Sequence, residues 1–374
     1  MGWKEESLAQ LDDLYSGMFD WLRNQYDSAT GGYYYAKSSV DNEQFSPDIE
    51  STAQALNILI RHQLAEKMPN PIKQQMVSFF QGKQDKTTGY FYDEHPAMKE
   101  DEVMVHRAMA YSVNSLKRLG ADCLYPLPIT LDVAPEYTKS LASYRKKWES
   151  IDLRNSWRGC DLLASSTVYI GQMPQDKQAA LVKACAEYLA EIQDKETGLW
   201  GEGSLYVRIS GTFKLHTFYR RFQIPMPNQQ KIYQSILYCL RNEEAIDMCY
   251  IRNPIDLLSY LALEIPDYES QEIMEITIRN MTKLKRADGG FSRELDHSPK
   301  APNVAQVKGD EYYPDMPEPV EIGLGLHEGD MNATTQATLI RKQLYHLLEC
   351  EPSTLVDADD FWQEWGQELE QKEV

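Results

Sequence analysis

The chain has 374 residues, of which 42% are hydrophobic and 25% are charged, a composition that indicates a globular protein and excludes collagen, coiled-coil and low-complexity classes. Asp and Glu number 57 against 38 Lys and Arg, and the net charge of -19 disfavours nucleic acid and anionic lipid surfaces as partners. No apolar run approaches the ~20 residues that a membrane span requires, and the six cysteines include no CxxC pair. We therefore expect a cytoplasmic protein with reduced thiols, no membrane span and no nucleic-acid partner.

A turn in which glycine precedes an aromatic residue recurs along the chain, each time after a helix-like segment. It occurs as DSATGGYYY at 27–35, QDKTTGYFY at 84–92, QDKETGLWG at 193–201 and RADGGFS at 286–292. The spacing fits a period of roughly 50 residues with two degenerate copies, near 146–155 and 243–253, which makes six repeats. We expect Gly32, Gly89, Gly198 and Gly290 to supply a positive φ, and the aromatic residue that follows to pack beneath the next repeat.

Each repeat joins two helical segments of different character. The segments before the turns are amphipathic and suit outer helices with one wet face: 8–26, 72–84, 141–149, 178–193, 230–242 and 270–286. The segments after the turns carry small residues on one side and suit inner helices packed on nearly every face: 49–62, 104–119, 156–171, 207–222, 254–265 and 330–348. This alternation predicts an all-α fold, an (α/α)6 toroid of six helical hairpins around a central cavity, in one domain over 1–374. A two-domain all-helical protein is the alternative.

Two segments lie outside the hairpin pattern. Residues 292–329 form a long connection rich in proline, which we interpret as a lid over one end of the ring or as a solvent-exposed spacer. Residues 352–374 form an acidic C-terminal extension, in which the DADD sequence at 357–360 suits a helix N-cap.

The repeated turns carry a resemblance to a known superfamily. QDKTTGYF and QDKETGLW resemble the Gln-to-Gly-x-Trp repeats of squalene cyclases, and RADGGFS is similar to the DGGF turn of protein prenyltransferase β subunits. The resemblance to this terpenoid cyclase and protein prenyltransferase superfamily implies a terpenoid or prenyl substrate in the central cavity, converted by acid/base or carbocation chemistry. Squalene-type cyclases use the central Asp of a DxDD motif as proton donor, but the DADD of this chain, at 357–360, follows the last inner helix. Asp247 with Cys249 resembles half of the zinc site of protein prenyltransferases, and the His of that site is missing. We therefore expect no metal and no cofactor.

The N-termini of the inner helices should converge at one rim, where free N–H groups and polar side chains favour function. The candidate catalytic residues are acid/base side chains expected to face one pocket: Asp330, Glu328, His327, Asp161 and His216. The candidate substrate-binding residues are Arg158, Arg208, Arg252, Trp157, Tyr250, Glu50 and His106, and other polar rim positions are Asp48, Arg107, Asn155, Lys214, Asn332 and Thr335. Arginines near helix N-termini oppose the helix dipole, so each needs a carboxylate partner or an anionic ligand. Asp48 and Asp330 also suit helix N-caps.

Three functions are compatible with these residues. The first is an enzyme of the terpenoid or prenyl type, in which Trp157, Phe213, Phe218 and Tyr260 stabilise a carbocation. The second is a carbohydrate-active hydrolase or lyase with an oligosaccharide substrate. The third is a non-catalytic binding toroid with a filled cavity. A deep aromatic cavity favours the first function, and a shallow one with paired carboxylates favours the second.

Overall fold

The computed structural model describes residues 2–261, 263–301, 319–363 and 365. Over these residues the chain forms fourteen α-helices joined by turns and short 3-10 helices. The same residues contain no strand, only isolated β-bridges such as that between Gln84 and Phe91. The predicted all-α class is therefore confirmed.

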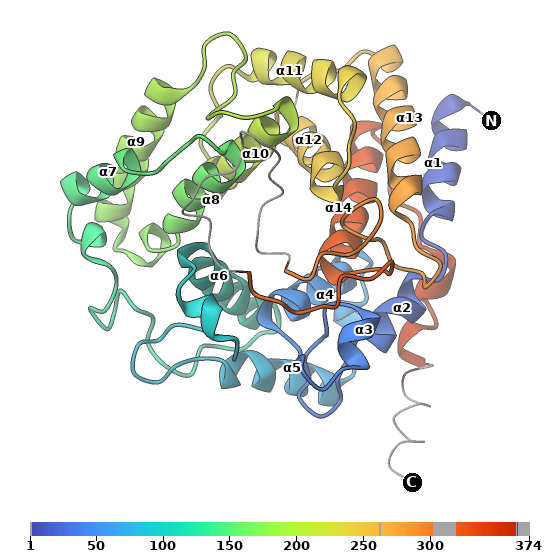
Figure 1. Cartoon of the computed structure of the whole chain (residues 1–374), viewed down its shortest axis with the longest axis horizontal. Helices are drawn as coiled ribbons and strands as arrows, with labels where there is room; N and C mark the ends of the chain where they lie inside the picture. Colours follow the sequence, from blue (N-terminus) through green and yellow to red (C-terminus); the bar gives the residue numbers. More distant parts are fainter. Residues whose placement is uncertain (1, 262, 302–318, 364, 366–374) are drawn as a thin grey trace.

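Six helices lie around a common centre (Figure 1): α4 (Ile49–Arg61), α6 (Glu102–Arg118), α8 (Ser156–Ser166), α10 (Leu205–Phe222), α12 (Met248–Leu261) and α14 (Met331–Leu347). Each contacts the next in this order, and α14 contacts α4, so that the contacts close into a cycle. Small residues allow the close approach that this packing needs. A Cβ at Gly211 of α10 would collide with Ser156 of α8.

The remaining long helices lie outside the central six (Figure 1): α1 (Trp3–Asp13), α2 (Met18–Asn24), α5 (Asn70–Gly82), α7 (Leu141–Glu149), α9 (Gln175–Ile192), α11 (Gln229–Asn242) and α13 (Asp267–Leu284). The outer segment predicted as one helix over 8–26 is two helices, because Gly17 adopts a φ of 73° between them. A short helix, α3 (Lys37–Val40), follows the first turn. Helix α1 packs against α13 and α14, which brings the start of the chain beside its last hairpin.

Three of the four repeated glycine turns share one backbone hydrogen-bond pattern. In these three the N–H of an aspartate and a carbonyl five residues later close the turn, as in Asp85 N to Tyr90 O at 2.8 Å. Gly89 and Gly198 adopt the expected positive φ, but in the Gly-Gly copies the positive φ falls on Gly31 and Gly289. The prediction for Gly32 and Gly290 is therefore wrong by one residue, because the first glycine of each pair makes the turn.

These turns also lie directly against the next repeat. A Cβ on Gly198 would come within 2.9 Å of the backbone nitrogen of Ile232 in α11. The side chains of Phe91, Leu199, Trp200 and Phe291 are fully buried, and Tyr90 is 9% exposed. The turn residues thus pack between consecutive hairpins, as the sequence predicts.

The two described ends of the long connection are hydrogen-bonded to each other. Ile322 N donates to Lys300 O at 2.9 Å, and Ser298 N donates to Leu326 O at 2.9 Å. The middle of the connection, on which the lid interpretation depends, falls on residues 302–318 and lies outside the described residues.

The described part of the C-terminal extension packs onto the first repeat. Phe361 lies 5.7 Å from Phe19, and Trp365 lies 4.8 Å from Tyr26, measured between ring centroids. Trp362 Nε1 donates to the carbonyl of Leu64 at 2.8 Å. Aromatic packing therefore anchors this acidic segment to the first repeat as far as it is described.

None of the helices in the described part of the chain combines the length and the apolar character needed to cross a bilayer.

Candidate functional site

A cavity of about 310 Å³ lies among the six central helices and takes lining residues from all of them. Its cationic lining residues are Arg61, Arg107, Lys214, Arg221 and Arg252. Among the described lining residues, Asp161 is the one carboxylate. Uncharged polar side chains, including His106, Tyr111 and Asn332, complete much of the wall. The cavity is therefore cationic, although the chain as a whole carries a net charge of -19.

Two of the five cations are neutralised by carboxylates. Lys214 Nζ lies 2.8 Å from Asp161 Oδ2, and Arg107 Nη2 lies 2.5 Å from Glu50 Oε1. Burial raises the pKa of Asp161, but Lys214 and Arg107 outweigh burial and hold the pKa below its usual value. Asp161 is thus ionised and fixed by Lys214, which suits a positioning residue better than a proton donor.

The other three cations, Arg61, Arg221 and Arg252, have no salt bridge to any described carboxylate. Arg252 donates from Nε to Gln336 Oε1 at 3.2 Å, and its guanidinium lies 3.9 Å from the centroid of the Phe213 ring. Because a guanidinium has five N–H donors, this pairing leaves Arg252 with donor capacity facing the cavity.

Arg61 and Arg221 bond only to neutral oxygens. Arg61 Nη1 donates to Thr335 Oγ1 at 2.9 Å and to Thr338 Oγ1 at 3.0 Å, and Arg221 Nη1 donates to Thr167 Oγ1 at 3.3 Å. Burial lowers the pKa of Arg61 to about 10, so that it remains charged at neutral pH. Three cations thus face one cavity without a salt bridge to any described carboxylate, while Asp256 acts on Arg61 and Arg252 from beyond salt-bridge distance.

A smaller cavity of about 30 Å³ adjoins the central one at the first turns of α8, α12 and α14. It shares Arg107, Asp161, Lys214, Arg252, Asn332 and Gln336 with the central cavity and adds Trp157, Arg158, Cys249 and Arg293. Arg158 Nη2 lies 2.6 Å from Asp101 Oδ1, and Arg293 Nε lies 3.1 Å from Asp247 Oδ2. Each of these two arginines is therefore paired with a carboxylate of the protein itself and needs no anionic ligand.

The residues proposed as catalytic are not brought together. Asp161 lines the central cavity, whereas Asp330 is the N-cap of α14 and accepts from Ala333 N at 2.7 Å. The second oxygen of Asp330 accepts from Arg293 N and from Ser298 Oγ, both at 2.7 Å. The structure does not place Asp330 beside Asp161 at the central cavity, because Oδ1 of Asp330 caps α14 and Oδ2 bonds α14 to the long connection.

Glu328 and His327 also make contacts within the connection and its surroundings. Glu328 accepts from Ser38 N at 2.9 Å and from Ser38 Oγ, and His327 Nδ1 lies 2.9 Å from the carbonyl of Asp296. His327 is exposed, and neither residue lines the central cavity.

Three further candidates lie away from the central cavity. His216 is buried with its Nε2 3.8 Å from Asp256 Oδ2, and burial lowers the pKa of His216 to about 4. Arg208 bonds to Asp194 at 2.8 Å in a repeated turn, and Tyr250 stacks on Tyr206 with ring centroids 4.9 Å apart. Packing and internal pairing account for these side chains.

His106 and Glu50 do lie at the cavities. His106 lines the central cavity with Nδ1 3.2 Å from Ser165 Oγ, and burial lowers its pKa to about 4, so that the imidazole is neutral at pH 7. Glu50 joins the central cavity to a second one, because it accepts from Arg107 and Asn332 while lining a pocket at the start of α4.

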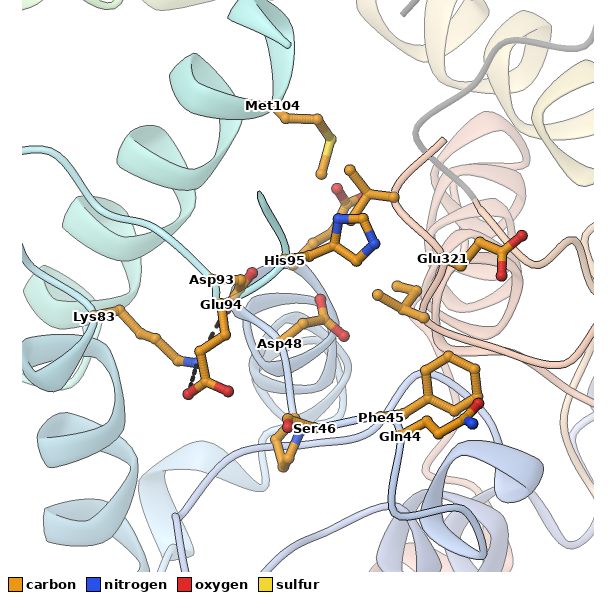
Figure 2. A pocket seen from close by; sticks show the side chains of 14 residues that line it. Gln44, Phe45, Ser46, Asp48, Lys83, Asp93, Glu94, His95, Met104 and Glu321 are labelled. Carbon is orange, nitrogen blue, oxygen red and sulfur yellow. Dashed lines mark ion pairs between the residues drawn. The ribbon is translucent and has the colours of Figure 1, made fainter. Parts of the chain in front are cut away.

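That second cavity, the rim pocket, has a volume of about 220 Å³ (Figure 2). Its acidic lining residues are Asp48, Glu50, Asp93, Glu94 and Glu321, and its apolar lining residues are Phe45, Pro47, Met104, Val320 and Ile322. Sequence reasoning singled out Asp48 and Glu50 but missed Asp93 and Glu321.

Arg61 and Arg221 of the central cavity were also not among the sequence candidates. Both occur near the C-terminal ends of inner helices, whereas the residues predicted from the sequence lie mainly near the N-terminal ends. The sequence feature that could have identified them is a charged residue at the end of a mostly apolar helix, as at Arg61 in IESTAQALNILIR.

The half-site resembling a zinc site is occupied by protein contacts. Asp247 accepts from Cys249 N at 2.7 Å and pairs with Arg293, and the part of the chain that is described holds no cluster of three His, Cys, Asp or Glu residues suited to a metal. Asp357, Asp359 and Asp360 of the DADD sequence are exposed at the surface. No family model and no curated protein sequence matches this chain.

Proposed function

We propose that the chain is an (α/α)6 toroid that binds a compact anionic molecule, bearing a phosphate or carboxylate group, in its central cavity. The cyclic contacts of the six central helices, with outer helices behind them, support the toroid. The observation that carries the ligand class is the set of three guanidinium groups, Arg61, Arg221 and Arg252, that line this cavity without a salt bridge to any described carboxylate.

Electrostatics favour an anionic ligand over an unliganded role for these arginines. Like charges gathered in one partly enclosed space repel one another, and a chain with 57 acidic residues offers many carboxylates that could have paired with them. Guanidinium groups bind phosphate and carboxylate through charge-assisted, bidentate hydrogen bonds. An anion in the cavity would therefore complete the coordination of cations that the protein leaves unpaired.

The same lining argues against carbocation chemistry in this cavity. Arg252 covers the face of Phe213, which is the face that would otherwise stabilise a cationic intermediate. Arg61 and Arg221 would add repulsion to any carbocation formed beside them. The terpenoid or prenyl hypothesis is therefore less well supported than an anionic ligand.

The carbohydrate-active alternative is retained for a sugar acid. The cations would neutralise a substrate carboxylate, and the neutral imidazole of His106 lies in the same wall as Tyr111. A uronic acid thus represents the carboxylate class of ligand, and inorganic phosphate or pyrophosphate represents the phosphate class.

Isothermal titration calorimetry with phosphate, pyrophosphate, glucuronate and neutral glucose tests the proposal. We expect at least one of the anions to bind and glucose not to bind. Arg252→Gln and Arg61→Gln should each weaken anion binding by ~10-fold or more, since each removes a charged hydrogen-bond donor. The control is Arg279→Gln, which makes the same charge change on the exposed face of α13.

Comparison of the anions decides between phosphate and carboxylate ligands. Absence of binding by all three anions would refute the proposal. Equal weakening of binding by Arg279→Gln and Arg252→Gln would also refute it, because the effect would then be one of net charge alone.

A further inference from the structure

The rim pocket differs from the central cavity in charge. Figure 2 shows Asp48 between a charged group of Lys83, Asp93 and Glu94 on one side and Phe45 and Glu321 on the other. The pocket therefore has an acidic part and an apolar part, whereas the central cavity is cationic. The acidic residues face a space that an anion would avoid.

One carboxylate oxygen in this pocket has no partner. Asp48 is the N-cap of α4, and its Oδ1 accepts from Ser51 N at 2.8 Å. Its Oδ2 is buried without a hydrogen-bond partner in the described structure, and the residue as a whole is only 5% exposed. A buried polar atom left unsatisfied costs free energy, so Oδ2 is a site at which a ligand donor would be stabilised.

Three other carboxylates of the rim pocket are already paired with cations. Asp93 accepts from Ile49 N with both oxygens, at 3.1 and 3.0 Å, and lies 3.3 Å from Lys83 Nζ. Lys83 also lies 3.8 Å from Glu94, and Glu50 is paired with Arg107 on its other side. Asp48, unlike Glu50, Asp93 and Glu94, has no cation within salt-bridge distance in the part of the chain described.

We propose that the rim pocket binds a small organic ammonium ion, with its N–H donors on Asp48 Oδ2 and its hydrocarbon part against Phe45, Met104 and Ile322. An ammonium ion supplies both the missing donor and the missing positive charge. The apolar wall favours an amine with a compact hydrocarbon body over inorganic ammonium.

Binding of the ammonium ion should release a proton. Burial and the neighbouring Asp93 carboxylate raise the pKa of Asp48 to about 8, so that at pH 7 the carboxyl group is mostly protonated. The other charged or titratable groups at the pocket are Glu50, Lys83, Asp93, Glu94, His95 and Glu321. An incoming cation stabilises the ionised form of Asp48, and the displaced proton passes to the solvent.

The probe is cyclohexylammonium, with cyclohexanol as its neutral counterpart of similar shape. In calorimetry at pH 7, we expect cyclohexylammonium to bind at least ~10-fold more tightly than cyclohexanol, the ratio for a hydrogen-bonded charge. Titration in two buffers with different ionisation enthalpies should show net release of protons to the buffer on binding. Equal binding of the amine and the alcohol, or no binding of either, would overturn the proposal.

Variants locate the site. Asp48→Asn keeps a good N-cap residue and should weaken cyclohexylammonium binding by ~10-fold or more, because it removes the charge. Glu43→Gln makes the same charge change at an exposed neighbouring position outside the pocket and should leave binding unchanged. Unchanged affinity in Asp48→Asn would place the amine elsewhere and refute the proposal.

A second variant does not depend on the stability of α4. Ser46 is exposed at the pocket, and Ser46→Lys should place an ammonium group of the protein near Asp48 and compete with the probe. Binding that persists at wild-type affinity in this variant would also contradict the assignment. Arg252→Gln should not alter amine binding, so failure of the anion proposal and failure of this one are separately observable.

Discussion

Three histidines lie at different points of the helical framework, His106 and His216 buried and His62 half-buried, and this burial lowers the pKa of each. The pKa falls to about 3 in His62 and to about 4 in His106 and His216. The unfolded chain has an ordinary histidine pKa near ~6.5, so it binds these protons at a higher pH than the folded protein does. Each histidine therefore contributes stability that is present above about pH 6.5 and is lost as the pH falls toward 4.

Replacement of His216 by leucine should reduce this acid sensitivity. His216 is 1% exposed, and its Nε2 has no hydrogen-bond partner among the described residues, so His216→Leu removes the titration and one hydrogen bond, between Nδ1 and the Phe213 carbonyl. A pKa change from ~6.5 to about 4 corresponds to ~3 kcal/mol. Urea unfolding at several pH values should show that His216→Leu loses less stability than the wild type between pH 6.5 and 4.

The comparison with the wild type is needed because other groups act in the opposite direction. Burial raises the pKa of Asp48 and Asp330, and both carboxyls favour the folded state as the pH falls. The same pH dependence of stability in both proteins would contradict this prediction, because it would show that folding does not lower the pKa of His216.

At the scale of the element, the repeated turn explains how consecutive hairpins are joined. Its glycine approaches the backbone of the next repeat, and the residues that follow enter the space between hairpins. In the third copy, Trp200 Nε1 donates to the carbonyl of Leu189 in α9 at 2.8 Å, and its ring lies 6.3 Å from that of Tyr219 in α10. One side chain thus connects an outer helix with an inner helix.

Trp200→Ala should destabilise the protein by ~3–5 kcal/mol, because it removes a fully buried indole and leaves a cavity between helices. Denaturant unfolding followed by circular dichroism measures the change. Tyr238→Ala is the control, since Tyr238 is 60% exposed on α11 and its loss should change stability by less than ~0.5 kcal/mol. Similar midpoints for Trp200→Ala and the wild type would contradict the packing role.

At the scale of the whole molecule, the first and last repeats are joined directly. Asp12 in α1 accepts from Arg341 Nε in α14 at 2.7 Å, and it also accepts from Tyr345 and Ser353. Burial raises the pKa of Asp12, but these bonds outweigh burial and lower it below its usual value. Met331 N also donates to Tyr35 O at 2.7 Å, so the backbone of the last repeat bonds to that of the first.

Asp12→Asn should lower the free energy of unfolding by about 2–4 kcal/mol, because it leaves the buried guanidinium of Arg341 without its carboxylate. Asp13→Asn, which changes an exposed carboxylate one residue along the same helix, should have little effect. Chemical denaturation of the two variants gives the comparison. Equal stability of the two would mean that this contact does not secure the closure of the cycle.

The features that arise from local patterns could be predicted from the amino-acid sequence. Small and apolar residues at helical spacing indicated all six central helices, since 3.6-residue periodicity is a property of each segment alone. The start of α12 was misplaced, because the helix begins at Met248 and contains Pro254, where the sequence placed its first residue. The N-caps at Asp48 and Asp330 were likewise predictable, because an aspartate before a helix satisfies N–H groups three residues away. The break at Gly17 was not, since a glycine within an amphipathic pattern is compatible with a continuous helix.

The set of polar side chains that share a cavity depends on how the helices pack and could not be predicted from the sequence. Asp330 was as good a candidate as Asp161 in the sequence, but the fold directs Asp330 toward Ser298 and Arg293 N while Asp161 faces the centre. Arg158 and Arg252 both lie near the starts of inner helices, yet a carboxylate forms a salt bridge with the first and none of those described does so with the second. Pairing depends on residues far apart in the chain, and the distances between such residues are set by how the helices pack, which no local pattern contains.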